Sequence, residues 1–211
     1  MSYLFDAPLR VRLLPRNKAG YPVPWFATWI NGEPDFRVVT QHKLDDAVRF
    51  GLCWVCGGAL GSYKAFLIGP MCMVNRTSSE PPSHRECAVF SARACPFLTV
   101  PGMRRRTTGI PEEAGAPGFM LRRNPGVALV WVTKRYSTFR AHAGGDGLLF
   151  DIGEPVETLW FAEGRQATRA EVLASVDSGL PSLRKMAEDE GPGAVADLEK
   201  QVSRAMGLVP A

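Results

Sequence analysis

The sequence predicts an α+β fold, and three observations point to that class. The chain has 211 residues, of which 45% are apolar and 22% charged, so it is long and apolar enough to bury a hydrophobic core. Glycine and proline, at 21 and 17 residues, indicate many turns and long connections. Strand-like and helix-like patterns both occur, and together they predict a small mixed sheet accompanied by C-terminal helices.

The predicted elements of the first half are short. Alternating apolar residues predict strands over residues 9–14 and 26–30, and the second strand ends at the turn signal Asn31-Gly32. A helix is predicted over residues 41–50, since a threonine that can cap its N-terminus precedes it and a glycine follows it. The first half therefore contains both kinds of element.

The second half of the chain has stronger patterns. Residues 126–133 form an apolar, β-branched run that is typical of a buried strand. Thr168 and Glu171 have the spacing of a capping box, which predicts that a helix begins there and ends at Gly179. In chain order, we expect strands over 126–133, 148–152 and 158–161, and helices over 168–179, 181–190 and 195–206.

These elements divide into two predicted lobes. Residues 1–98 form an N-terminal lobe, and residues 127–211 form an α+β C-terminal lobe. Residues 99–126 between them are rich in glycine, proline and arginine, which predicts a linker or a long surface loop. The sequence leaves open whether the two lobes pack as one domain.

Composition excludes some classes of protein. The longest apolar run, residues 127–132, is far shorter than the ~20 residues that span a bilayer, so no membrane partner is expected. Asp6 and Pro8 stand where a signal peptide needs an apolar stretch, which predicts a cytoplasmic protein. Five cysteines, an odd number, argue against a disulfide framework and favour metal binding or reduced thiols.

Cys53 and Cys56, followed by Gly57, form a C-x2-C-G motif that is typical of a zinc knuckle. Two cysteines at this spacing can hold one metal ion in a tight turn, and the glycine lets the backbone bend after the second cysteine. Residues 63–75 are expected to form a β-hairpin with its turn at Gly69-Pro70.

Ser83 and Glu86 have capping-box spacing, which predicts a helix that starts at His84. His84 and Cys87 are three residues apart and lie on one face of the first turn, where the helix dipole favours the Cys87 thiolate. A knuckle, a hairpin and a helix N-terminus in this order are typical of treble-clef-like zinc fingers. We therefore predict a structural Zn²⁺ ion bound by Cys53, Cys56, His84 and Cys87.

Two cysteines remain outside this set. Cys95 lies eight residues after Cys87, a rise of ~12 Å in a continuous helix, which is too far for both thiolates to bind one zinc ion. Cys95 is instead expected to end the helix and pack in the core. Cys72, on the second strand of the predicted hairpin, stays open as an alternative ligand that would replace His84.

Three catalytic interpretations fit the same motifs less well. A redox Cys-x-x-Cys pair needs a βαβ setting, whereas here a predicted helix precedes Cys53. A zinc deaminase would use His84 and Glu86, but its motifs have the opposite order, and Cys87 would occupy the position of the catalytic water. An HNH-type nuclease needs a histidine between knuckle and helix, and residues 57–83 contain none. No catalytic residue is assigned.

The charge distribution favours an anionic partner for the first half. Residues 1–110 carry 14 basic and 7 acidic residues, a net charge of +7, whereas residues 111–211 have a net charge of −3. Seven basic residues near the finger are candidates for nucleic-acid binding: Lys64, Arg76, Arg85, Arg93, Arg104, Arg105 and Arg106. The alternative is a solvated face that keeps the protein soluble. Trp25, Trp29 and Trp54 are able to stack on bases but are more often core residues.

Several segments resemble a group of uncharacterised bacterial and phage proteins that share a C-x2-C-G … P-P-x-H-x-E-C-A … C-P pattern. The matching segments are Pro24-Trp25-Phe26, Pro34-Asp35-Phe36-Arg37, Cys53-Trp54-Val55-Cys56-Gly57, Gly69-Pro70-Met71-Cys72, Pro81-Pro82-Ser83-His84-Arg85-Glu86-Cys87-Ala88, Cys95-Pro96-Phe97-Leu98 and Gly164-Arg165-Gln166-Ala167-Thr168-Arg169-Ala170-Glu171-Val172. The resemblance covers most of the chain. It implies a zinc-binding protein and no particular activity.

These features predict a non-enzymatic binding protein whose partner is a nucleic acid or another protein. The closed set of four ligands and the basic first half support this prediction. A metal-dependent hydrolase or nucleotide-modifying enzyme is the alternative, and it would need an open position on the metal. A structural or assembly component of phage origin is a third interpretation.

Overall fold

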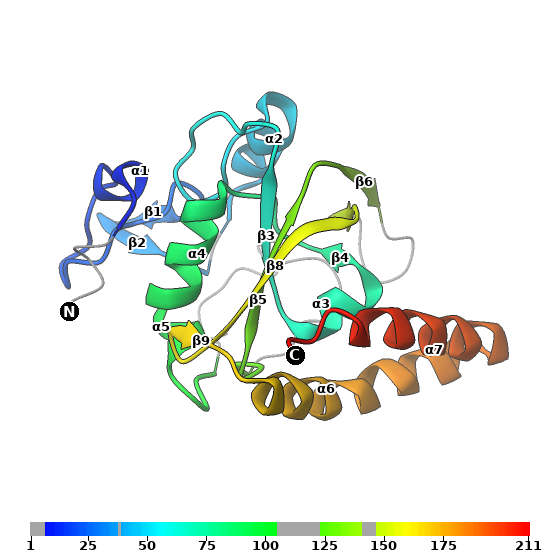
Figure 1. Ribbon diagram of the computed structural model, residues 1–211. Helices are drawn as coiled ribbons and strands as arrows, with labels where there is room; N and C mark the ends of the chain where they lie inside the picture. Colours follow the sequence, from blue (N-terminus) through cyan, green and yellow to red (C-terminus); the bar gives the residue numbers. More distant parts are fainter. Residues whose placement is uncertain (1–6, 38, 105–122, 141–146) are drawn as a thin grey trace.

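The computed structural model has the predicted α+β fold (Figure 1) and describes residues 7–37, 39–104, 123–140 and 147–211. Its strands are β1 (Thr28–Ile30), β2 (Glu33–Asp35), β3 (Lys64–Ile68), β4 (Thr77–Ser78), β5 (Ala128–Thr133), β6 (Tyr136–Arg140), β7 (Leu148–Ile152), β8 (Pro155–Ala162) and β9 (Arg165–Gln166). Its helices are α1 (Leu9–Arg12), α2 (Gln41–Phe50), α3 (Pro70–Asn75), α4 (Arg85–Ala94), α5 (Pro96–Thr99), α6 (Arg169–Glu190) and α7 (Pro192–Met206).

The centre of the fold is a long antiparallel hairpin that bends in its middle. β6 closely follows β5 and β8 closely follows β7, so that β5 pairs with β8 and β6 with β7. The pairing register shifts once, at a β-bulge between Val132 and Thr133. Gly153 N–H donates to Arg135 O at 3.0 Å next to this bulge. A Cβ on Gly153 would lie 2.3 Å from that oxygen, so the two strands approach too closely there for any larger residue.

β3 and β4 extend this hairpin into two small sheets. The four-stranded sheet has the order β3-β5-β8-β9, and the three-stranded sheet has the order β4-β7-β6. All the pairings between described strands are antiparallel, so the prediction of one mixed sheet was wrong. Hydrogen bonds between β3 and β5 connect the two predicted lobes directly.

The larger hydrophobic core lies between the strands and helices α3, α6 and α7. Trp131, Phe66 and Phe150 are its largest fully buried side chains. Every residue of β5 is buried, as its apolar run predicts. The other face of β5 is covered by α4, where Ala88 and Ala92 pack against alternate residues of the strand.

Two helical predictions in this region hold, and one was wrong. α2 occupies residues 41–50 and ends at Gly51 in the left-handed conformation. α6 begins after Thr168, which forms both hydrogen bonds of the predicted capping box. The predicted break at Gly179 does not occur, and α6 continues through Pro181. A Cβ on Gly179 would lie 2.8 Å from the Met71 side chain, so this glycine permits close packing and does not end the helix.

Two predicted elements of the first half were wrong. Residues 9–12 form the short helix α1 and no strand, because this turn lets Val11 and Leu14 pack inward. Residues 63–75 form no hairpin, since β3 pairs with β5 and Pro70 starts helix α3 at a position that needs no N–H donor. The predicted turn at Asn31-Gly32 does form, with positive φ at both residues, and it joins β1 and β2 into a hairpin.

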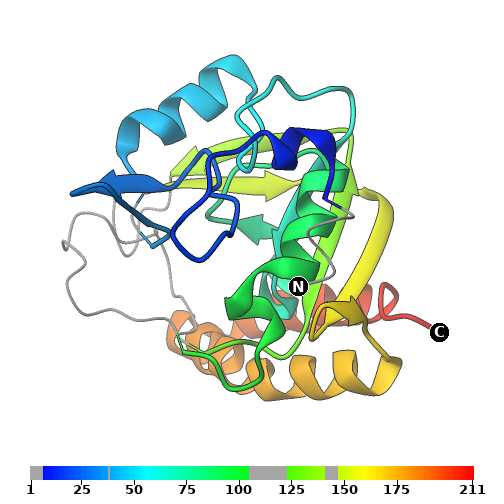
Figure 2. The ribbon, with the colours of Figure 1, turned by 90° about the vertical axis from the view of Figure 1, so that its left-hand side faces the viewer.

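The N-terminal segment with α1, β1 and β2 lies on the opposite side of the molecule from α6 and α7 (Figures 1 and 2). α4 packs between that segment and the strands, because its residues contribute to both neighbouring clusters. None of the described helices is long and apolar enough to cross a membrane. Residues 105–122, most of the predicted linker, lie outside the described part of the chain.

Candidate metal centre

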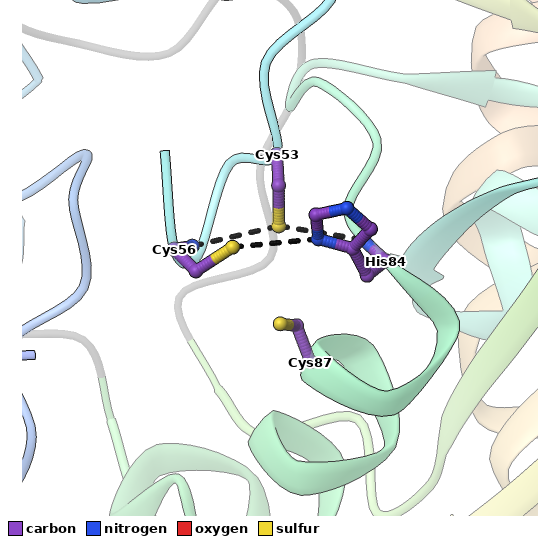
Figure 3. Close-up of side chains that lie close together, drawn as sticks. All are labelled: Cys53, Cys56, His84 and Cys87. Carbon is purple, nitrogen blue, oxygen red and sulfur yellow. Dashed lines mark hydrogen bonds between the residues drawn. The ribbon is translucent and has the colours of Figure 1, made fainter. Parts of the chain in front are cut away.

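The fold brings together the four side chains that the sequence selects as zinc ligands. The sulfur atoms of Cys53, Cys56 and Cys87 and a ring nitrogen of His84 all lie within 4.8 Å of one another (Figure 3). Among the described residues, this is the one group of three or more histidine, cysteine or acidic side chains that is compact enough to hold a metal ion.

The first two cysteines lie in a knuckle closed by backbone hydrogen bonds. Cys53 N–H donates to Gly58 O, and Gly57 N–H donates to Cys53 O, each at 2.8 Å. Gly57 has a φ of +71°, which a residue with a Cβ rarely adopts. A Cβ at this position would also lie 2.6 Å from the Trp25 indole, so both conformation and packing require the glycine that the motif supplies.

The other two residues lie at the start of α4. Cys87 is in the first turn, as predicted, whereas His84 is the N-cap and the helix starts one residue later than predicted. The predicted capping box does not form, because Ser83 lies one residue before the N-cap. Ser83 instead exchanges two backbone hydrogen bonds with Ala65 of β3, each 2.8 Å long. Glu86 turns to solvent and lies 3.5 Å from Arg10.

The hydrogen bonds of His84 determine which of its nitrogens is available to a metal. Nε2 lies 3.0 Å from the carbonyl oxygen of Ala59. A carbonyl only accepts hydrogen bonds, so Nε2 carries the ring proton and Nδ1 is left with a lone pair. Nδ1 is the atom that faces the cysteines, 3.3 Å from the Cys56 sulfur (Figure 3). The knuckle therefore fixes the tautomer that metal binding requires.

Cys53 is the sulfur most stabilised as a thiolate. It accepts a hydrogen bond from the Cys87 thiol and from the backbone N–H groups of Cys56 and His84, at 3.4 and 3.3 Å. These donors lower the pKa of Cys53. The same hydrogen bond raises the pKa of Cys87, and burial raises the pKa of Cys56. Three crowded sulfurs cannot all ionise without a cation among them, which is the electrostatic condition of a metal-thiolate site.

The surroundings of the cluster are small and apolar. Cys53 and Cys87 are fully buried, and Ala7, Val11 and Val55 complete the buried part of the cluster. α1 takes part through Val11, which sequence reasoning missed because it assigned this segment to a strand. Cys56 and His84 are half-buried, so the centre is shielded but reachable from one side.

The two remaining cysteines lie outside the cluster. Cys72 is in α3, whose neighbours in the larger core belong to α6 and α7, and it is not part of the four-residue group. The prediction that Cys72 lies on a hairpin strand was wrong, because no hairpin forms there. Cys95 is the C-cap of α4 and ends that helix as predicted. Burial raises the pKa of both thiols, so each is held in its neutral form.

The basic residues selected as nucleic-acid contacts do not share one environment. Arg85 forms a two-pronged ion pair with Glu157, with both distances 2.6 Å. The Arg76 side chain is 13% exposed, is paired with Glu154 and lies over the Trp131 ring. Lys64 donates to Ser62 O and is half-buried, whereas Arg93 and Arg104 are exposed. Arg105 and Arg106 lie outside the described residues.

The three tryptophans considered as base-stacking residues also differ in environment. Trp54 is buried and stacks on Phe26, with ring centroids 5.2 Å apart. Trp25 contacts Trp54 edge-on and packs behind the knuckle. Trp29, near the turn of the β1–β2 hairpin, is exposed. Trp54 is therefore a core residue, and Trp25 supports the knuckle.

In comparisons with known protein families, curated proteins and solved structures, no match to this chain was found. The class of site is therefore defined by its geometry. It is a Cys₃His cluster in which a knuckle supplies two sulfurs and a helix N-terminus supplies one nitrogen and one sulfur.

Proposed function

We propose that this chain is a zinc-binding protein in which one structural Zn²⁺ ion is held by Cys53, Cys56, His84 and Cys87. The observation that carries the proposal is the mutual approach of all four ligand atoms within 4.8 Å. In a tetrahedral zinc site, sulfur and nitrogen ligands are about 3.6 Å apart and two sulfurs about 3.8 Å apart. The 3.3 Å between Cys56 Sγ and His84 Nδ1 is close to the first of these distances.

A site of this composition supports a structural role for the metal. Catalytic zinc sites have three protein ligands and keep one position for water or substrate, whereas four protein ligands fill the tetrahedron. The ion would join the knuckle to α4, two segments with about 30 residues between them. A site with four protein ligands supports a non-enzymatic binding protein more than a hydrolase. Reduced thiolate ligands also fit the proposed cytoplasmic location.

The order of elements supports a treble-clef-like module with a long insertion. β3 follows the knuckle, and Ser83 pairs with Ala65 of β3 by a bridge directly before α4. These two paired segments take the place of the hairpin that such modules have between knuckle and helix. α3 and β4 lie in the chain between the two segments, so the two strands of this hairpin would be far apart in sequence.

The proposed biological role is the binding of a protein or nucleic-acid partner. The ion pairs of Arg76 and Arg85 reduce the positive charge available to phosphate groups. This favours a protein partner over a nucleic acid. Titration with short DNA and RNA at two salt concentrations separates the alternatives. Binding at low salt that weakens steeply with added salt would favour a nucleic acid, and no binding at low salt would exclude it.

Metal analysis of the purified protein tests the zinc proposal. We expect one zinc ion per chain in the wild type, and also in the control variants Cys72→Ser and Cys95→Ser. Cys53→Ser and Cys87→Ser should lose the ion, because each removes a thiolate ligand. Co²⁺ replacing Zn²⁺ in the wild type should give the absorption of a tetrahedral thiolate site. Full zinc content in Cys87→Ser, or loss of zinc in Cys72→Ser, would contradict the assigned ligands.

A further inference from the structure

The outer edge of β6 is covered by no strand among the described residues. β3 covers the outer edge of β5, and β4 covers that of β7. Among the described residues, β6 pairs only with β7 and has no strand on its other side. β3 begins opposite Thr133, so its pairing stops just before β6 starts. A strand that paired with β6 on this side would complete a fourth position in the sheet β4-β7-β6.

The hydrogen-bonding pattern shows which backbone groups this edge presents. Gly153 N–H donates to Arg135 O, which marks a hydrogen-bonded position of the hairpin, although the Arg135 N–H itself donates to Thr133 Oγ1. The pattern alternates along an antiparallel pair, so Ser137 and Phe139 also bond to β7. Tyr136 and Thr138 lie between them and direct their N–H and C=O groups to the outer edge. The same alternation is seen on β7. Ile152 lies opposite Tyr136, and its N–H donates away from β6, to Arg76 O.

This edge is exposed and positively charged at its start. The four residues from Ser137 to Arg140 are exposed. Lys134 and Arg135, directly before β6, are exposed as well. The Lys134 ammonium lies 5.5 Å from the ring centre of Tyr63, which directly precedes β3 and is 52% exposed. An aromatic side chain and two cations thus border the place that an added strand would enter.

We propose that the outer edge of β6 binds an extended, acidic segment of a partner protein as an added β-strand. The backbone groups of Tyr136 and Thr138 would pair with the segment, and Lys134 and Arg135 would attract its carboxylates. A second copy of this chain fits the edge less well, since two such edges would bring like charges together. The proposal concerns a surface separate from the metal centre, so it can hold or fail independently of zinc binding.

Hydrogen exchange with a strand-forming acidic peptide tests this proposal on the zinc-loaded full chain. The probe is a capped peptide of alternating glutamate and valine. We expect the Tyr136 and Thr138 amides to exchange rapidly in the protein alone and to become protected when the peptide binds. The amides of Ser137 and Phe139, already bonded to β7, should be protected in both states. Protection of the Thr138 amide before any peptide is added would show that the edge is already covered and would overturn the proposal.

Two controls separate strand addition from simple charge attraction. The same peptide with alternate backbone nitrogens methylated keeps its charge but loses N–H donors, so it should not protect Thr138. The double variant Lys134→Glu with Arg135→Glu should weaken peptide binding about fivefold, as expected for two exposed ion pairs. A matched double variant, Arg12→Glu with Lys185→Glu, should bind normally. Equal binding of the methylated peptide, or of both double variants, would contradict the proposal.

The oligomeric state shows whether a second copy of this chain occupies the β6 edge in place of an acidic partner. Sedimentation of the protein alone should give a monomer whose mass does not change with the Lys134→Glu and Arg135→Glu substitutions. A dimer that protects the Thr138 amide would assign the edge to a second copy and overturn the acidic-partner proposal. Displacement of the peptide by DNA, with the Thr138 amide left unprotected in the DNA complex, would likewise show that charge alone drives binding.

Discussion

Two hydrophobic clusters of the molecule differ greatly in size. The cluster beneath the strands and helices α3, α6 and α7 contains nineteen buried residues, among them Trp131, Phe150 and Trp160. The cluster around the candidate metal centre contains five, and two of those are the proposed ligands Cys53 and Cys87. We therefore expect apolar burial to be sufficient to organise the first region, and the second region to need a cross-link to fold. The proposed metal ion would supply that cross-link.

The largest expected effect comes from removing one ligand of the smaller cluster. Cys87→Ser should unfold the knuckle and loosen α1, because structural zinc contributes roughly 10 kcal/mol of apparent binding free energy in zinc-finger peptides. Near-ultraviolet circular dichroism should lose the signal of Trp25 and Trp54, which pack beside the knuckle. Cys95→Ser is the control, since that thiol lies outside the metal group. An unchanged aromatic signal in Cys87→Ser would show that the small cluster folds without its metal.

The matching test of the larger cluster is Phe150→Ala. The Phe150 side chain is fully buried and contacts Phe66 and Tyr136, so its removal should cost ~3–5 kcal/mol of unfolding free energy. Denaturant unfolding measures this loss. The folded fraction should still bind one zinc ion per chain, since no metal ligand lies in this cluster. Reduced zinc content in the folded variant would mean that the two clusters are not independent.

A smaller effect is expected from replacing the knuckle glycine. Gly57 and Gly20 both have positive φ, but a Cβ would contact Trp25 only at Gly57, and at Gly20 nothing lies within 4 Å. Gly20→Ala should cost about 1 kcal/mol from backbone strain alone. Gly57→Ala should cost a further ~1–3 kcal/mol and weaken zinc affinity, because the clash displaces the loop that carries Cys56. Equal stability losses, measured by denaturant unfolding, would contradict the role given to Trp25.

The smallest effect concerns the start of α6, far from the metal. Contacts with Arg165 and Thr168 lower the pKa of Glu171 to about 2, from a usual value of 4.5. The ionised carboxylate therefore stabilises the fold above pH 4.5, and this contribution is lost as the pH falls toward 2. Glu171→Gln should lower the melting temperature slightly at pH 6, and the difference from wild type should shrink as the pH falls. A constant difference across this range would contradict the assigned ionisation.

The sequence predicted which four side chains lie close together, because metal chemistry constrains residue type and spacing locally. Cys53, Cys56 and Gly57 follow one another in a short turn, and His84 and Cys87 share one turn of a helix. The same local logic located α2 and the N-terminus of α6, where capping residues mark helix ends. Features of this kind depend on residues only a few positions apart.

The wrong predictions depend on contacts between distant residues. β3 pairs with β5, more than 60 positions later in the chain, so its neighbour was not visible in the segment itself. Gly179 was interpreted as a helix end, because its close contact with Met71 of α3 cannot be inferred from local pattern. Val11 was placed on a strand for the same reason, since its burial depends on the metal cluster. The Ala59 carbonyl that orients His84 also carries no sequence signal.

Region-resolved hydrogen exchange, with and without a zinc chelator, tests the central claim most directly. Chelation should remove amide protection from residues 52–60 and from the first turn of α4, whereas β5 and α6 should keep theirs. Readdition of Zn²⁺ should restore the lost protection. Protection around the knuckle that does not change on chelation, in protein shown to have lost its metal, would contradict the claim that a metal ion holds this region together.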